Sequence, residues 1–221
     1  MNNTKAKKQI INAFIEELRQ RWINIKKLSE TFPGEGLVLA YCFTEAMGYY
    51  RFGFGENASK LSSAEQFVKI LHDYQSSKVF MIIPYLFVKE IPLENGKRPF
   101  GQSIKEDVLN WLKTALPKDK DLHIATIWEQ IPRNIYQAMN KRLQMNYGYL
   151  YQLTWAGYYY HMIRTAGIHR GNFPKINVED ELKEVIKANN EILNRLGKEC
   201  LDEVKFPHEL DQPVSLYDVV Y

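Results

Sequence analysis

The chain has 221 residues, of which 45% are hydrophobic and 25% are charged. These values are ordinary for a globular protein and allow one large domain. The formal net charge is only +3, and this excludes the dense basic balance of a protein that binds duplex nucleic acid tightly and without sequence preference. Any contact with nucleic acid would therefore have to be local.

The two cysteines and the apolar runs indicate the compartment. Cys42 and Cys200 are far apart and have no metal-ligand spacing, which indicates reduced thiols in a cytoplasmic protein. Residues 1–8 are polar and basic and lead into an amphipathic segment, whereas a signal peptide needs a continuous apolar core. The longest apolar run, Val79–Val88, is interrupted by Pro84 and is too short to span a bilayer. We expect a soluble, cytoplasmic protein with no membrane partner.

The first segment has apolar residues at spacings of three and four, which predicts a long amphipathic helix stopped by Pro33-Gly34. Its apolar stripe consists of Ile10, Ile11, Phe14, Ile15, Leu18, Trp22, Ile25 and Leu28. Leu37–Tyr50 is apolar on all sides except for Glu45, which favours a central helix in a bundle. A buried carboxylate there needs a cation or several donors nearby. Arg51–Gly55 contains two glycines and predicts a plain loop.

The middle of the chain predicts shorter elements. Ser62 begins a capping-box pattern, so we expect a helix to about Tyr74. Val79–Val88 fits a short helix and a buried strand equally well. An extra loop or small hairpin is expected near residues 89–102, where Asn95-Gly96 is a favoured turn pair.

The helical pattern continues in the second half. Ser103–Leu116 predicts a helix that Pro117 stops, and Ile124–Trp128 begins another that Pro132 kinks or restarts. Asn134–Ala166 contains no proline, so we expect one long or once-broken helix packed with tyrosines. Aromatic residues at helical spacing are usually core or dimer interface, and here we favour an interface over a surface that stacks RNA bases.

The last predicted helix follows Asn177, a residue type that caps helices, and ends at Gly197. Its apolar stripe consists of Val178, Leu182, Val185, Ile186, Ile192, Leu193 and Leu196. Residues 207–221 predict an irregular tail. The fold class that follows is all-α, with one helical-bundle domain over residues 1–206 and a C-terminal tail.

The densest polar chemistry lies in Tyr158–Phe173, where a helical segment meets a glycine-containing turn. The sequence has no His-Glu-x-x-His, Gly-x-Ser-x-Gly or phosphate-loop motif, and it predicts no metal or other cofactor. Arg164 and His169 would point roughly 140° apart on a continuous helix. Gly167 can end the helix and let His169 fold back toward Arg164. Such a pair suits phosphate chemistry, because an arginine holds phosphate oxygens bidentately and a histidine moves a proton near neutral pH.

The spacing alone leaves a structural alternative open. In that alternative, Arg164 pairs with a carboxylate and His169 hydrogen-bonds the turn at the helix end. Three further polar residues of this stretch could line the same site, namely His161, Arg170 and Asn172. For His161 the alternative is a hydrogen bond to a buried tyrosine, and for Arg170 it is a solvated side chain.

Arg164-Thr-Ala-Gly-Ile-His169, followed by Arg170-Gly171, resembles the signature of the HEPN superfamily of helical-bundle domains. That signature is an arginine, usually followed by a polar residue, with a histidine four to six residues downstream. Leu37–Gly48, with its single acid, resembles an internal helix of such bundles. The sequence departs from the family at Thr165, where Asn, Asp or His is frequent.

The resemblance implies a metal-independent endoribonuclease of toxin or defence type, in which two protomers place their motifs in one cleft. The ribose 2′-hydroxyl would attack the adjacent phosphate, with His169 as the acid/base group, Arg164 holding the phosphate and Thr165 orienting one of them. The expected partners are RNA, a second copy and an antitoxin or regulatory protein. Two alternatives remain: a catalytically inactive module that binds RNA or protein, and a helical structural or interaction protein in which the motif is accidental.

Overall fold

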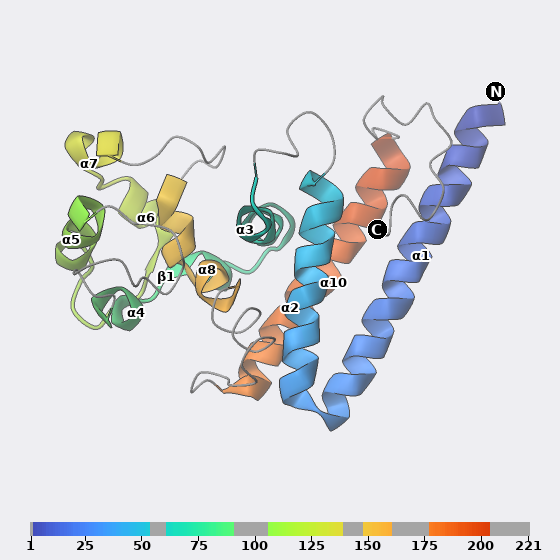
Figure 1. Cartoon of the computed structure of the whole chain (residues 1–221), viewed down its shortest axis with the longest axis horizontal. Coiled ribbons are helices and arrows are strands. Elements are labelled where there is room, and N and C mark those ends of the chain that lie inside the picture. Colours follow the sequence, from blue (N-terminus) through green and yellow to red (C-terminus); the bar gives the residue numbers. More distant parts are fainter. Residues whose placement is uncertain (1, 54–60, 91–105, 139–147, 161–176, 204–221) are drawn as a thin grey trace.

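The structure, a computed structural model, describes residues 2–53, 61–90, 106–138, 148–160 and 177–203. These residues are mainly helical, as the all-α prediction requires. Four helices form the main bundle: α1 (Asn2–Thr31), α2 (Pro33–Phe52), α3 (Ser63–Tyr74) and α10 (Val178–Glu203). Figure 1 shows α1, α2 and α10 at one end of the molecule and a group of short elements at the other, with α3 between them.

The amphipathic prediction for the first helix is confirmed. Ile15, Leu18 and Trp22 of α1 are buried, whereas Ile10 at the start of the predicted stripe is 59% exposed and lies outside the core. Pro33 separates α1 from α2 and occupies the first position of α2, where its missing N–H has no intrahelical partner to lose.

α2 is the central helix, as its apolar sequence predicts. It packs against α1, α3 and α10, and Leu37, Ala40 and Met47 are fully buried. At Gly48 a Cβ atom would lie 2.7 Å from the carbonyl oxygen of Gln66, so glycine allows α2 and α3 to approach closely. The loop predicted from Arg51 begins later than expected, because Arg51 and Phe52 form the last turn of α2.

The capping box before α3 is confirmed. The Ser62 N–H donates to Glu65 Oε2 at 2.5 Å, and the Glu65 N–H donates to Ser62 Oγ at 3.4 Å. These two bonds satisfy donors that the first turn of a helix leaves without partners, and they fix where α3 begins.

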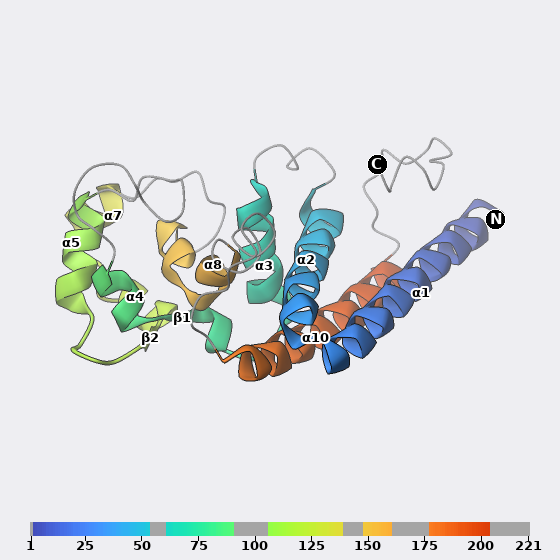
Figure 2. The ribbon, with the colours of Figure 1, turned by 60° about the horizontal axis from the view of Figure 1, so that its bottom comes forward.

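The short elements lie beyond α3, on the side away from α1 (Figure 2). They are η2 (Val79–Met81), β1 (Ile82–Ile83), α4 (Tyr85–Glu90), α5 (Glu106–Ala115), β2 (Leu122–His123), α6 (Ile124–Trp128) and α7 (Arg133–Ala138). The run 79–88 therefore contains both a helix and a strand. β1 pairs antiparallel with β2, with Ile82 opposite His123. The loop or hairpin expected near 89–102 falls mostly in 91–105, outside the described residues.

Of the long or once-broken helix predicted over residues 134–166, residues 139–147 and 161–166 lie outside the described residues, and the described part has a break at Thr154. α7 ends at Ala138, and a 3-10 helix, η3 (Gly148–Leu153), is followed by α8 (Trp155–Tyr159). Thr154 interrupts the helical segment because its backbone is extended. Its hydroxyl donates to the Tyr151 carbonyl at 2.6 Å. Residues 150–153 are all buried, so packing overrides the helical tendency of this segment.

α10 begins as predicted and ends later. The Asp180 N–H donates to Asn177 Oδ1 at 3.5 Å, which is an N-cap bond. The predicted end at Gly197 is wrong, since α10 continues to Glu203. Gly197 instead faces Ile15 of α1, and a Cβ there would make only ordinary contact at 3.4 Å. The described helices include none that is long and apolar enough to cross a membrane.

Candidate functional site

The motif residues fall in the segment 161–176, which lies outside the described residues. Its predicted site residues are His161, Arg164, Thr165, His169, Arg170 and Asn172. The structure does describe both ends of this segment, Tyr160 after α8 and Asn177 before α10. The candidate site is therefore built from the side chains around these two ends.

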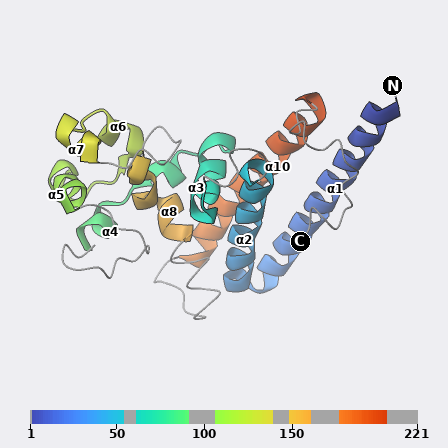
Figure 3. The same cartoon turned by 45° about the horizontal axis from the view of Figure 1, so that its top comes forward.

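The first end lies against α2 and α3. The Tyr160 hydroxyl donates to Glu45 Oε1 of α2 at 3.4 Å, and its ring centroid lies 5.3 Å from that of Phe67 on α3. Figure 3 shows α8 beside α3. Glu45, the single charge of the central helix, is half-buried rather than fully buried. The sequence predicted that this carboxylate needs a donor, and Tyr160 is one.

The second end is linked to the first through α10. The Tyr159 hydroxyl donates toward the Glu181 carboxylate in the first turn of α10. Burial and then this carboxylate raise the pKa of Tyr159 well above its ordinary value. Burial also raises the pKa of Glu181, with the charges of Glu184 and Asp180 adding to the effect and the Tyr159 hydrogen bond opposing it. The end of α8 and the first turn of α10 are therefore in contact.

Three carboxylates belong to the elements at these two ends of the segment. Glu45 contacts the first end, and Glu181 and Glu184 lie in the first two turns of α10. The segment that joins the two ends carries Arg164 and His169 among its cations.

Tyr151 and Tyr159 of this region lie in the core, which is one of the two roles expected of aromatic residues at helical spacing, whereas Tyr136 is 47% exposed. Tyr159 stacks on Tyr41 at 5.3 Å between ring centroids and on Trp155 at 5.4 Å. Tyr41, Tyr151 and Tyr159 are each at most 2% exposed. Stacked, buried rings hold the end of α8 against α2, and they are not available to stack on RNA bases.

Tyr41 offers a direct test of this packing. Among the described residues its buried hydroxyl has no hydrogen-bond partner, and burial raises its pKa well above the ordinary value. We expect Tyr41→Phe to raise the free energy of unfolding by about 1 kcal/mol, because an unpaired polar atom leaves the core. Tyr159→Phe, the matched control, loses the interaction with Glu181 and should lower it by about 1 kcal/mol. Urea unfolding measures both, and a destabilised Tyr41→Phe would contradict the assignment.

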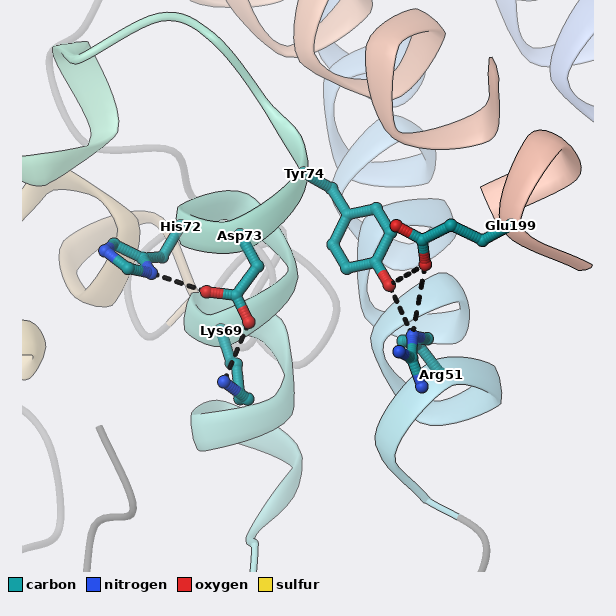
Figure 4. A network of polar contacts seen from close by, with 6 residues as sticks. All are labelled: Arg51, Lys69, His72, Asp73, Tyr74 and Glu199. Atoms are coloured by element: carbon teal, nitrogen blue, oxygen red, sulfur yellow. Dashed lines mark hydrogen bonds and ion pairs between the residues drawn. The ribbon is translucent and has the colours of Figure 1, made fainter. Parts of the chain in front are cut away.

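A second set of polar side chains surrounds the end of α3 (Figure 4). On one side, Asp73 accepts hydrogen bonds from Lys69 Nζ at 2.7 Å and from His72 Nδ1 at 2.6 Å. Burial acts to raise the pKa of Asp73, but these two partners outweigh burial and the net pKa is lowered. Lys69 and Asp73 form an ion pair at i and i+4 of α3, a spacing at which side chains meet on a helix surface.

On the other side of α3, Tyr74 connects two helices. Its hydroxyl donates to Glu199 Oε2 of α10 at 2.5 Å and accepts from Arg51 Nε of α2. Burial and Glu199 raise the pKa of Tyr74 to about 12, against the opposing effect of Arg51. Arg195 lies over the Tyr74 ring at 5.1 Å. These contacts tie α2, α3 and α10 together, and we assign them a structural role.

The described residues contain no group of three or more His, Cys, Asp or Glu side chains that could hold a metal ion. Comparison of the chain with models of known families, with curated proteins and with solved structures finds no match. The functional assignment therefore depends on the motif and on the side chains around its segment.

Proposed function

We propose that this protein is a HEPN-like, metal-independent endoribonuclease. The observation that carries the proposal is the Arg164-x4-His169 motif, with Gly167 between the two residues. Two features support it. The described chain is mainly helical, and the two ends of the motif segment lie together against the central helix, at Tyr160 and in the first turn of α10.

In the proposed reaction the ribose 2′-hydroxyl attacks the adjacent phosphorus and the 5′-oxygen of the next nucleotide leaves. The products are a 2′,3′-cyclic phosphate and a free 5′-hydroxyl, so the proton lost from the 2′-oxygen is balanced by the proton gained by the leaving oxygen. His169 transfers these protons, and Arg164 binds the phosphate oxygens on which negative charge develops. Thr165 orients one of the two side chains.

The residues around the motif have supporting roles. His161, Arg170 and Asn172 are proposed to contact RNA, Arg170 through a phosphate group. Glu45 and Glu181 lie at the ends of the segment, where a carboxylate can hold a guanidinium in a fixed orientation. Two protomers would form one cleft, and the toxin or defence class would add an antitoxin or regulatory protein in the cytoplasm.

The test compares RNA cleavage by the purified protein, Arg164→Ala and His169→Ala, with EDTA present throughout. The RNA is a mixture of structured and unstructured molecules. Arg21→Ala is the matched control, because Arg21 is an exposed arginine of α1 paired with Glu17. We expect cleavage by the native protein and the control, ending in 2′,3′-cyclic phosphates, and loss of at least about a hundredfold in both motif variants.

Two outcomes would overturn the enzymatic assignment. Equal cleavage by all four proteins would identify a contaminating nuclease. Absence of cleavage by the native protein, together with RNA binding that Arg164→Ala weakens, would assign the chain as a catalytically inactive RNA-binding module.

A further inference from the structure

An apolar face lies on the side of α2 that is turned away from α10. Thr44 of α2 faces α10, because its hydroxyl donates to Asn189 Oδ1 at 2.8 Å. Leu39 and Tyr49 are each five residues from Thr44 and therefore lie roughly 140° around the helix from it. Leu39 is 38% exposed and Tyr49 is 47% exposed, so this side of α2 presents large apolar side chains to solvent.

Ring contacts continue this face from α2 onto α1. Phe14 of α1 packs edge-on against Tyr50 of α2 with 5.0 Å between ring centroids, and Tyr50 packs against Tyr49 at 6.3 Å. Ile10 is 59% exposed and lies one turn before Phe14, on the same side of α1. Ile10, Phe14 and Tyr49 thus belong to one apolar strip that crosses both helices. An exposed strip of this kind is typical of a docking surface.

The end of α10 lies beside the start of the apolar strip. The Trp22 Nε1–H of α1 donates to Asn190 Oδ1 of α10 at 2.7 Å. Two turns further along α10, Gly197 faces Ile15 of α1. The two helices are therefore antiparallel, and the same register brings Glu203, the last residue of α10, level with the start of the strip. Figure 1 shows the start of α1 and the end of α10 at one end of the bundle.

Residues 204–221 follow α10 and lie outside the described residues, and their sequence has two parts. Residues 214–221 read Val-Ser-Leu-Tyr-Asp-Val-Val-Tyr, so six of these eight residues are apolar or aromatic. The ten residues 204–213 join this apolar segment to α10. Ten extended residues span roughly 33 Å, whereas a helix with its side chains is about 10–12 Å wide. The apolar segment can therefore reach the face that α10 does not cover.

Formal charge and tethering favour this segment as the occupant of the strip. Residues 204–221 contain three acids, Glu209, Asp211 and Asp218, and one lysine, which gives a formal charge of −2 with histidine neutral. Residues 2–10, at the start of α1, contain three lysines and no acid. Opposite charges at one end of the bundle attract each other. A segment on a flexible tether also has an effective concentration on the order of millimolar, which favours the same chain over a second copy.

We propose that residues 214–221 dock on the apolar strip of their own chain. Docking removes apolar side chains of both partners from water, which is its driving force. Glu45 lies one turn before Tyr49 on α2 and accepts a hydrogen bond from Tyr160, so the docked segment is a strap beside the candidate site. The proposal uses none of the motif residues and does not depend on the proposed nuclease activity.

The first test measures cleavage of the full chain by chymotrypsin, which cuts after aromatic residues and can cut after Tyr217. The cleavage rate of a docked segment follows the fraction of undocked chain. Tyr49→Ser should speed cleavage after Tyr217 about tenfold, because it removes a ring from the strip. Ile10→Ser, on the other helix, should act in the same direction. Tyr136→Ser is the matched control and should cleave as the native chain does, because Tyr136 is also 47% exposed and lies on α7.

The second test measures where the segment lies. Both native cysteines are replaced by serine, and a cysteine is placed at one position of 214–221 at a time. Each is combined with Ala46→Cys, at a half-buried position on α2 close to Tyr49, or with the control Ile23→Cys. Ile23 is 39% exposed and lies half a turn around α1 from Phe14. A disulfide needs Cα atoms within roughly 7 Å, so at least one position should form an intramolecular disulfide with Ala46→Cys about tenfold faster than with Ile23→Cys.

The outcomes separate docking from its alternatives. Faster cleavage confined to residues 214–221 supports docking, whereas faster cleavage throughout α1 and α2 would show that the strip only stabilises the bundle. Equal cleavage of Tyr49→Ser and Tyr136→Ser, or equal disulfide formation by Ala46→Cys and Ile23→Cys, overturns the proposal. Disulfide-linked dimers in place of intramolecular disulfides would also overturn it and would assign the face to a second copy.

Discussion

Replacing Trp22 by alanine is expected to lower the free energy of unfolding by about 3–5 kcal/mol. Trp22 is 2% exposed and joins three helices. Its ring stacks on Phe43 of α2 with 5.1 Å between centroids, and its Nε1–H donates to Asn190 Oδ1 of α10 at 2.7 Å. Alanine would leave a large cavity at the centre of α1 and would remove the hydrogen bond to α10.

Two further variants separate the contribution of the Trp22 ring from that of its hydrogen bond and provide a control. Trp22→Phe keeps an aromatic ring against Phe43 and loses the hydrogen bond, so it should cost less than Trp22→Ala. Ile23→Ala is the matched control, because Ile23 is the adjacent residue and is 39% exposed. Urea denaturation followed by far-UV circular dichroism measures all three. If Trp22→Ala and Ile23→Ala had equal effects, α1 would not pack on the bundle through Trp22.

The long helices were predictable because their signals are local. The apolar stripe of α1, the apolar surface of α2, and the caps at Ser62 and Asn177 are encoded within a few residues of the elements they define. The structure confirms them, except that Ile10 and Leu28 at the two ends of the α1 stripe are exposed. Pro33 was predicted to stop α1, and it also begins α2.

The positions that the sequence left open or placed wrongly depend on packing between distant segments. The break at Thr154 accompanies the burial of residues 150–153, although a threonine at the N-cap of α8 is also a local signal of a helix start. Gly197 is typical of a helix end, yet there it faces Ile15 across the α1–α10 contact. Local propensity is too weak to decide such positions.

The candidate site also has one part that the sequence predicts and another part that only the fold shows. The Arg164–His169 motif is a local pattern, so sequence alone could propose it. Glu45 of α2 contacts Tyr160 and Glu181 of α10 contacts Tyr159, and only the fold brings these carboxylates to the two described ends of the segment. The pairing of Ile82 with His123 rests on two-residue strands, which are too short for periodicity to reveal.

Asn189→Leu is expected to lower the free energy of unfolding by about 2–3 kcal/mol, although leucine is of similar size. Asn189 is fully buried in α10, where its Nδ2 donates to the Ala40 carbonyl at 2.9 Å and its Oδ1 accepts from Thr44 Oγ1 at 2.8 Å. These bonds fix the register of α10 on the central helix. Leucine would remove both bonds and place an apolar side chain against the Ala40 carbonyl and the Thr44 hydroxyl, which would keep only their bond to each other at 3.0 Å.

Asn194→Leu is the matched control, because Asn194 is exposed on the same helix, and it should change the stability by less than about 0.5 kcal/mol. Thr44→Val should itself be destabilising, since it leaves Asn189 Oδ1 without its donor. The double variant Thr44→Val/Asn189→Leu should cost less than the sum of the two single variants, because removing both partners leaves fewer unpaired groups than removing one. Strict additivity in urea unfolding would show that the two side chains do not interact, and the α2–α10 register would then depend on apolar packing alone.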